Sequence, residues 1–161
     1  MSGLADLSNA YTSLPVIMLR LMLAALLGAV IGFDREVRNR PAGLRTHMLV
    51  ALAATAFTLI TLELLHQARS LQPEGSFDPI RVVEAVTAGV AFLAAGTIIQ
   101  SRGNVQGLTT GAAMWLTGAV GVAVGFGLYV IAVLTTVLAL LILVAVSFIP
   151  IPQADAEPDQ R

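Results

Sequence analysis

The sequence predicts an all-α integral membrane protein with about five transmembrane helices. Hydrophobic residues make up 57% of the 161-residue chain, and charged residues only 12%. Soluble domains contain about 25% charged residues, and a soluble chain this apolar would expose patches that aggregate. The mean hydropathy of +0.84 agrees with a lipid environment. The apolar residues also fall into segments close to the ~20 residues that cross a bilayer.

Five apolar segments have this length, and several carry boundary signals. Pro15 suits the first turn of a helix, where its missing N–H leaves no hydrogen bond unmade. Asp78 can cap the third segment and Pro79 can open it. Pro150 and Pro152 end the fifth segment. The predicted helices cover residues 14–33, 48–65, 82–100, 109–127 and 128–149.

The boundary between the last two helices has the fewest signals, since only Gly125, Phe126 and Gly127 mark a turn. A single helix of ~40 residues would be far too long for a hydrocarbon core of ~30 Å, so a tight helical hairpin is predicted. The polar composition of the C-terminal tail predicts disorder. The chain then divides into an N-terminal polar segment, a five-helix transmembrane domain and this tail: residues 1–13, 14–150 and 151–161.

Arginine placement predicts the orientation in the membrane. Loops rich in basic residues stay in the cytoplasm, so five spans leave the N-terminus outside and the C-terminus in the cytoplasm. The first basic residue is Arg20, inside the first apolar segment, so we expect that helix to be retained rather than cleaved as a signal peptide. The arginines that set this orientation lie in two loops: Arg35, Arg38, Arg40, Arg45 and Arg102.

Composition and motifs argue against several functions. The chain has no cysteine, which excludes disulfides and thiolate metal sites. Its net charge of -1 provides no basic surface for nucleic acid. The sequence has no phosphate loop, nucleophile elbow, zinc protease motif or dinucleotide fingerprint. We therefore expect no enzyme activity and no cofactor other than a possible Mg²⁺ ion.

Glycines form stripes on two of the predicted helices. On the fourth helix they recur at helical spacing along one face, and a shorter pair repeats the pattern on the first helix. Glycine allows two backbones to approach closely, which is how helices associate in lipid. Close helix packing is the prediction, and a thin-walled ion path along the same face is the alternative. The positions are Gly28, Gly32, Gly111, Gly118, Gly121 and Gly125.

Three ionisable residues, Arg20, Glu63 and Glu84, lie within predicted spans. Charges inside a membrane are costly and usually pair with each other or face water. We predict that Arg20 forms an ion pair with Glu84 or Glu63. The alternative is an outer vestibule for a cation.

The densest polar cluster extends from Asp34 to His47. Asp34 ends the first predicted helix, where the helix dipole disfavours a carboxylate, so it needs compensation from Arg35, Arg38 or Arg45. The position also suits Mg²⁺, which binds one or two carboxylates and keeps several waters. A network of interfacial salt bridges is the alternative. The candidate metal ligands in the whole chain are Asp34, Glu63 and Glu84.

Three stretches occur in order along the membrane region, at residues 28–47, 89–96 and 105–115. The first contains Gly-Ala-Val-Ile-Gly-Phe-Asp-Arg and then Arg-Pro-Ala-Gly-Leu-Arg-Thr-His, and the third reads Val-Gln-Gly-Leu-Thr-Thr-Gly-Ala-Ala-Met-Trp. Together they resemble the hallmark stretches of the MgtC/SapB family. The second stretch departs from that pattern, because the family usually has Gly-Phe-Leu-Gly-Ala-Gly there, and Ala91 and Ala94 replace two of its glycines.

The resemblance implies an inner-membrane protein linked to magnesium limitation and, in some pathogens, to survival in macrophages and restraint of the ATP synthase. Longer members carry a C-terminal domain similar to an ACT fold, so this chain resembles a short form. We expect a regulator of another membrane complex such as the ATP synthase. The alternative is a transporter or channel for Mg²⁺ or another cation, formed by an oligomer; glycine-rich faces favour a dimer. The positions matching the family's polar residues are Asp34, Arg35, Arg45, Asn104 and Thr109.

Overall fold

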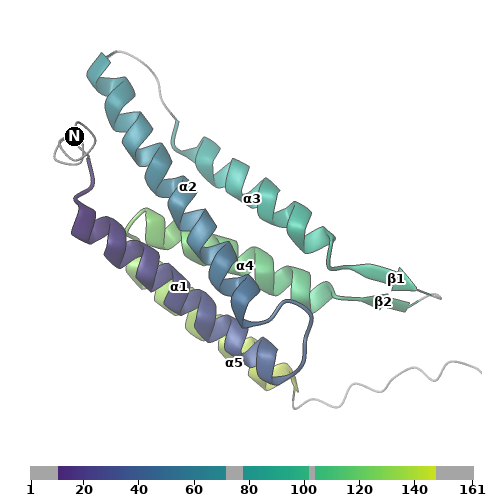
Figure 1. Cartoon of the computed structure of the whole chain (residues 1–161). Helices are drawn as coiled ribbons and strands as arrows, with labels where there is room; N and C mark the ends of the chain where they lie inside the picture. The colour runs from purple at the N-terminus through teal and green to yellow at the C-terminus, as the bar shows by residue number, and fades with distance from the viewer. Residues whose placement is uncertain (1–10, 72–77, 102–103, 148–161) are drawn as a thin grey trace, which may run out of the picture.

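The computed structural model describes residues 11–71, 78–101 and 104–147. These residues contain five α-helices and one β-hairpin (Figure 1). The predicted C-terminal tail and most of the N-terminal polar segment lie outside them. The elements are α1 (Leu14–Val37), α2 (Leu44–Leu71), α3 (Ile80–Ala95), β1 (Ile99–Ser101), β2 (Asn104–Gln106), α4 (Leu108–Gly125) and α5 (Tyr129–Ser147).

Three of these helices, α1, α2 and α4, are long and apolar enough to cross a membrane. α1 has 24 residues, which corresponds to about 36 Å at the usual helical rise and exceeds a hydrocarbon core of ~30 Å. α5 adds a shorter apolar stretch over residues 129–145. α3 has 16 residues and carries Arg81 and Glu84 in its first turns. The prediction of an all-α membrane protein is therefore confirmed, with three clear spans among the five helices.

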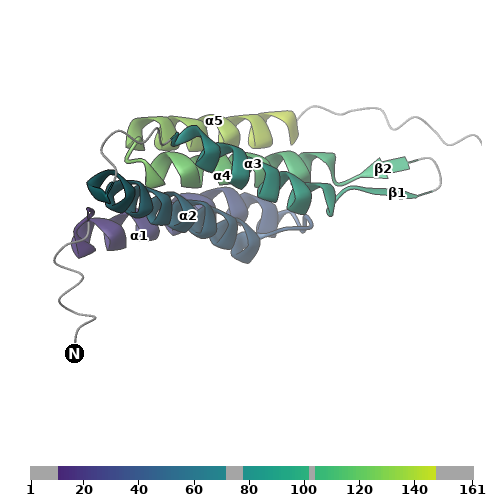
Figure 2. The same ribbon diagram turned by 90° about the horizontal axis from the view of Figure 1, so that it is seen from above.

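The third helix is shorter than predicted, because the chain forms a hairpin where the helix was expected to continue to residue 100. α3 ends at Ala95, and just beyond it the Thr97 hydroxyl donates to the carbonyl oxygen of Ala94 at 2.7 Å. β1 then pairs with β2 in antiparallel register, with Gln100 opposite Val105. Figures 1 and 2 show this hairpin extending away from the ends of the helices.

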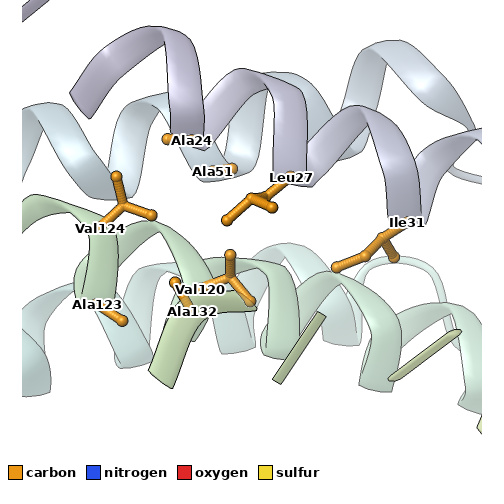
Figure 3. Packing of buried hydrophobic residues seen from close by; sticks show 8 residues of the cluster. All are labelled: Ala24, Leu27, Ile31, Ala51, Val120, Ala123, Val124 and Ala132. Atoms are coloured by element: carbon orange, nitrogen blue, oxygen red, sulfur yellow. The ribbon is translucent and has the colours of Figure 1, made fainter. Parts of the chain in front are cut away.

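The central helix of the bundle is α4, which contacts all four other helices. In Figure 2, α5 lies on one side of α4, and α1 and α2 lie on the other. Most buried side chains at this junction are small, so the helix backbones approach closely. Figure 3 shows the resulting apolar cluster of Ala24, Leu27, Ile31, Ala51, Val120, Ala123, Val124 and Ala132.

Two glycines of α4 bring that helix against α2. A Cβ atom added at Gly121 would overlap the carbonyl oxygen of Ala51, and one at Gly125 would lie 2.5 Å from the Cβ of Thr58. The Thr55 hydroxyl also donates to the carbonyl oxygen of Gly121 at 2.7 Å. A side chain at either glycine would therefore force the two helices apart.

The other two glycines of the stripe face α3. A Cβ atom at Gly118 would lie 2.9 Å from Cγ2 of Val90, and one at Gly111 would lie 3.1 Å from the carbonyl oxygen of Ala94. The stripe thus packs against two neighbouring helices, α2 and α3, and all four of its glycines are buried. Gly89 on α3 differs, because a Cβ atom there would meet nothing within 4 Å.

Candidate functional site

One end of the bundle gathers most of the polar side chains singled out in the sequence. α1 ends there, and α2 and α4 begin there (Figure 1). We call it the arginine end, after Arg35, Arg38, Arg40 and Arg45.

The connection between α1 and α2 is held in a defined shape. Asn39 and Ala42 both have a φ of 51°, a left-handed conformation that asparagine tolerates and alanine rarely adopts. Glu36 stabilises the connection, since its Oε2 accepts the backbone N–H of Leu44 at 2.9 Å. That bond satisfies a free donor at the start of α2, a role for Glu36 that sequence reasoning missed.

Arg35 connects the end of α1 to the start of α4. Its side chain is almost fully buried, with the residue only 4% exposed. Nη2 donates to the hydroxyl oxygen of Thr110 at 2.6 Å, while Nε is buried and has no partner among the described residues. A buried charge with an incomplete set of hydrogen bonds is costly to keep, so this contact between α1 and α4 is sensitive to the loss of either partner.

His47 lies close to Arg35. The residue is fully buried at 0% exposure, and its Nδ1 lies 2.9 Å from the carbonyl oxygen of Gly43. Because a carbonyl oxygen only accepts, Nδ1 carries the proton in the neutral ring and Nε2 is left as an acceptor. Nε2 has no partner among the described residues. The arginine end thus holds a buried free donor and a buried free acceptor, which suits a water molecule or another small polar group.

The glycines of α1 hold α1 close to this part of α2. A Cβ atom at Gly28 would lie 2.6 Å from the carbonyl oxygen of His47, and one at Gly32 would lie 2.8 Å from Cα of Leu44. These contacts bury the histidine against the α1 backbone.

Asp34 faces a different part of the same end. Its Oδ1 accepts from Nε of Arg38 at 2.8 Å, so Arg38 supplies the compensation that the sequence required. Oδ2 is buried and has no partner in the described part of the chain. The carboxylate lines a groove of about 730 Å³, together with Ala29, Val30, Phe33, Val37, Arg38, Leu44 and Leu140.

The predicted polar cluster only partly coincides with this arrangement. Arg35 is buried in it, whereas Arg45 and Thr109 are exposed at its edge. The backbone of Asn104 belongs to β2, and its side chain lies outside what the structure describes. Helix α4 begins after Gly107, which has a φ of 88° and provides no side-chain cap.

The three candidate metal ligands do not come together. Asp34 lies at the arginine end, whereas Glu63 lies near the opposite end of α2, where its Oε2 accepts the backbone N–H of Tyr11 at 3.0 Å. Glu84 is exposed on α3. Within residues 11–71, 78–101 and 104–147, no group of three His, Cys, Asp or Glu side chains could hold a metal ion.

The predicted ion pair between Arg20 and Glu84 or Glu63 is wrong for the described residues. Nη1 of Arg20 instead donates to the carbonyl oxygen of Gly125 at 2.8 Å, and Nε donates to the Tyr129 hydroxyl at 3.2 Å. The C-terminus of a helix has free carbonyl groups and a negative dipole end. The end of α4 therefore satisfies the arginine without a carboxylate, and Arg20 ties α1 to the turn between α4 and α5.

The fold and the site define an α-helical membrane protein with a polar cluster at one end of a bundle built on small residues. Residues 21–150 match the MgtC family, and the chain belongs to that family. No solved structure matches it.

Similar proteins come from several bacteria. The chain is 38% identical over 125 residues to "Putative magnesium transporter YhiD" of Escherichia coli K12, covering 78% of this chain and 58% of YhiD. It is 33% identical over 147 residues to SapB of Bacillus subtilis, covering 91% of this chain and 62% of SapB. It is 42% identical over 114 residues to MgtC of Brucella abortus, covering 71% of this chain and 44% of that MgtC. The chain thus spans less than two thirds of the length of these relatives.

Proposed function

We propose that this chain is an inner-membrane regulator in magnesium homeostasis, which acts by binding another membrane complex such as the ATP synthase and catalyses no reaction. Membership of the MgtC family supports the link to magnesium, as does the name of the Escherichia coli relative, which refers to magnesium transport.

The observation that carries this proposal is that charged side chains of α1 serve internal contacts. Arg20 binds the end of α4, Arg35 binds Thr110 and Asp34 binds Arg38. Small apolar side chains fill the space around α4. Transporters of ions instead place polar groups near the middle of the membrane. The charges of this chain therefore support a packed bundle, which leaves its outward faces to act on a partner.

The glycine stripe of α4 does not offer a surface to a partner, because its glycines are buried against α2 and α3. We place the contact on the outward face of α5. This helix packs mainly on α1 and α4, and apolar side chains such as Val130 and Leu134 are exposed along it. Helices of a membrane complex can pack on such a face without desolvating any charge.

The test is ATP-driven proton pumping by the ATP synthase in vesicles that also contain this protein. We expect a lower initial pumping rate than in vesicles without it. The α5 variant Val130→Trp should relieve the inhibition by adding bulk to the contact. Met22→Trp on α1 is the matched control, because Met22 is 66% exposed and Val130 is 73% exposed. Pumping that is unchanged by the folded protein would refute a direct action on this complex.

A second function, cation transport by an oligomer, is favoured by one observation. Asp34 lines a groove at the arginine end, and its buried Oδ2 has no partner among the described residues. A carboxylate in this setting can bind a partly hydrated Mg²⁺ ion. Mg²⁺ flux that Asp34→Asn removes would establish this alternative.

A further inference from the structure

A second groove lies between α2 and α3, away from the polar cluster. It has a volume of about 520 Å³. The residues that line it are spaced along one face of each helix, over residues 50–61 of α2 and residues 81–93 of α3. On the α3 side the small residues Ala85 and Gly89 leave space for the groove, and nothing lies within 4 Å of a Cβ atom placed at Gly89.

The lining of this groove is apolar except at one end. Ten of its twelve lining residues are alanine, glycine, valine, leucine or phenylalanine, and the other two are Thr61 and Arg81. The Thr61 hydroxyl already donates to the carbonyl oxygen of Phe57 at 2.8 Å. Arg81 is exposed, and its side chain has no hydrogen bond or ion pair with any residue that the structure describes. The groove is therefore apolar along most of its length and has a guanidinium without a partner among the described residues at one end.

The length of the groove matches one leaflet of a bilayer. The thirteen residues from Arg81 to Leu93 rise by about 18 Å along α3, and half of a hydrocarbon core of ~30 Å is about 15 Å. Arg81 is the second residue of α3, so an acyl chain that lies along the groove can place its phosphate beside this side chain. A guanidinium binds phosphate by charge-assisted hydrogen bonds.

We propose that the groove between α2 and α3 is a binding site for an anionic phospholipid, which lays an acyl chain along the groove and places its phosphate at Arg81. The positive charge of Arg81 and the length of the groove favour this occupant. An apolar helix of a partner would leave the guanidinium without a counter-charge. The site lies in the leaflet opposite the arginine end, because α2 and α3 run antiparallel and Arg81 is in the first turn of α3, which begins away from the arginine end (Figure 1).

The probe is quenching of tryptophan fluorescence by lipids with brominated acyl chains. Trp115 is the only tryptophan and does not line this groove, so the reporter protein is Phe57→Trp with Trp115→Phe. It is reconstituted in phosphatidylcholine vesicles containing an equal fraction of brominated phosphatidylglycerol or brominated phosphatidylcholine. One arginine near an anionic lipid headgroup should favour the brominated phosphatidylglycerol about fivefold.

Three variants make the result specific to the groove. Arg81→Gln in the reporter should make the two brominated lipids equivalent, whereas Arg69→Gln, an exposed arginine at the same end of the bundle that does not line the groove, should keep the preference. Gly89→Leu should reduce quenching by both lipids, because its side chain fills the groove.

Three results would overturn the proposal. Equal quenching by both lipids in the reporter would show that the groove takes bulk lipid without selection. An unchanged preference in Arg81→Gln would show that the selection arises elsewhere. Absence of quenching by either lipid in the folded reporter would show that protein, such as a second copy of the chain, covers the groove.

Discussion

Replacing Gly121 by leucine should prevent recovery of folded protein. A Cβ atom at this position would overlap the carbonyl oxygen of Ala51 and would lie 2.8 Å from the Cβ of Ala54, both on α2. Backbone atoms cannot rotate away as a flexible side chain can, so the whole helix would have to move. Overpacking of a well-packed core costs about 1–3 kcal/mol, and we expect Gly121→Leu to reach or exceed the upper end. The measurement is the yield of monodisperse protein in detergent and its unfolding midpoint.

The matched control for this substitution is Gly89→Leu. Gly89 also lies in a helix, but a Cβ atom there would meet nothing within 4 Å. Both substitutions exchange a helical glycine for leucine, so a difference between them reports packing rather than helix propensity. Equal yields and equal unfolding midpoints for the two variants would contradict the position of α4 against α2.

Removing the hydroxyl of Thr110 should give the second large effect. Thr110→Val keeps the shape of the side chain but leaves Nη2 of the buried Arg35 without its 2.6 Å partner. Hydrogen bonds to charged groups contribute about 1.5–3 kcal/mol, and the lost partner cannot be replaced by bulk water in a residue only 4% exposed. We expect an unfolding free energy lower by about 2 kcal/mol in a detergent denaturation series.

The conservative and double substitutions separate this bond from general packing. Thr110→Ser keeps a hydroxyl and should recover most of the lost stability. In an Arg35→Met background, Thr110→Val should cost much less, because the charge that needed the hydroxyl is absent. A double-mutant cycle with no coupling between the two positions would contradict the contact between α1 and α4.

The helices were predictable from the sequence because lipid requires long apolar segments with internally satisfied backbones. The end of α3 differs from the prediction, because Ile98 and Ile99 continue the apolar segment but the helix ends at Ala95 and β1 begins at Ile99. Hydropathy reports that a segment is apolar and does not distinguish its last helical turn from a short strand. The glycine positions were recognisable by spacing, but spacing could not show that one stripe faces two helices.

The polar site was less predictable, because its partners are far apart in the chain. The sequence predicts a carboxylate partner for Arg20, whereas the carbonyl oxygen of Gly125 at the end of α4 accepts its hydrogen bond. Such a partner belongs to the backbone and leaves no signal in residue type. Thr110 could have been preferred to Thr109, since the seven-residue spacing from Thr110 to Thr117 places both on the buried side of α4. The spacing from His47 to Ala51 and Ala54 would likewise have placed that histidine on the buried side of α2.

The most direct test of the proposed regulatory role is Mg²⁺ uptake into liposomes that contain only this protein, with Asp34→Asn measured in parallel. Folding and orientation are checked in the same vesicles by protease accessibility of the arginine end. A regulator that acts through its outward faces should give uptake equal to that of protein-free liposomes. Uptake by the wild-type protein that Asp34→Asn abolishes would instead make the chain a transporter with Asp34 on the route of the ion.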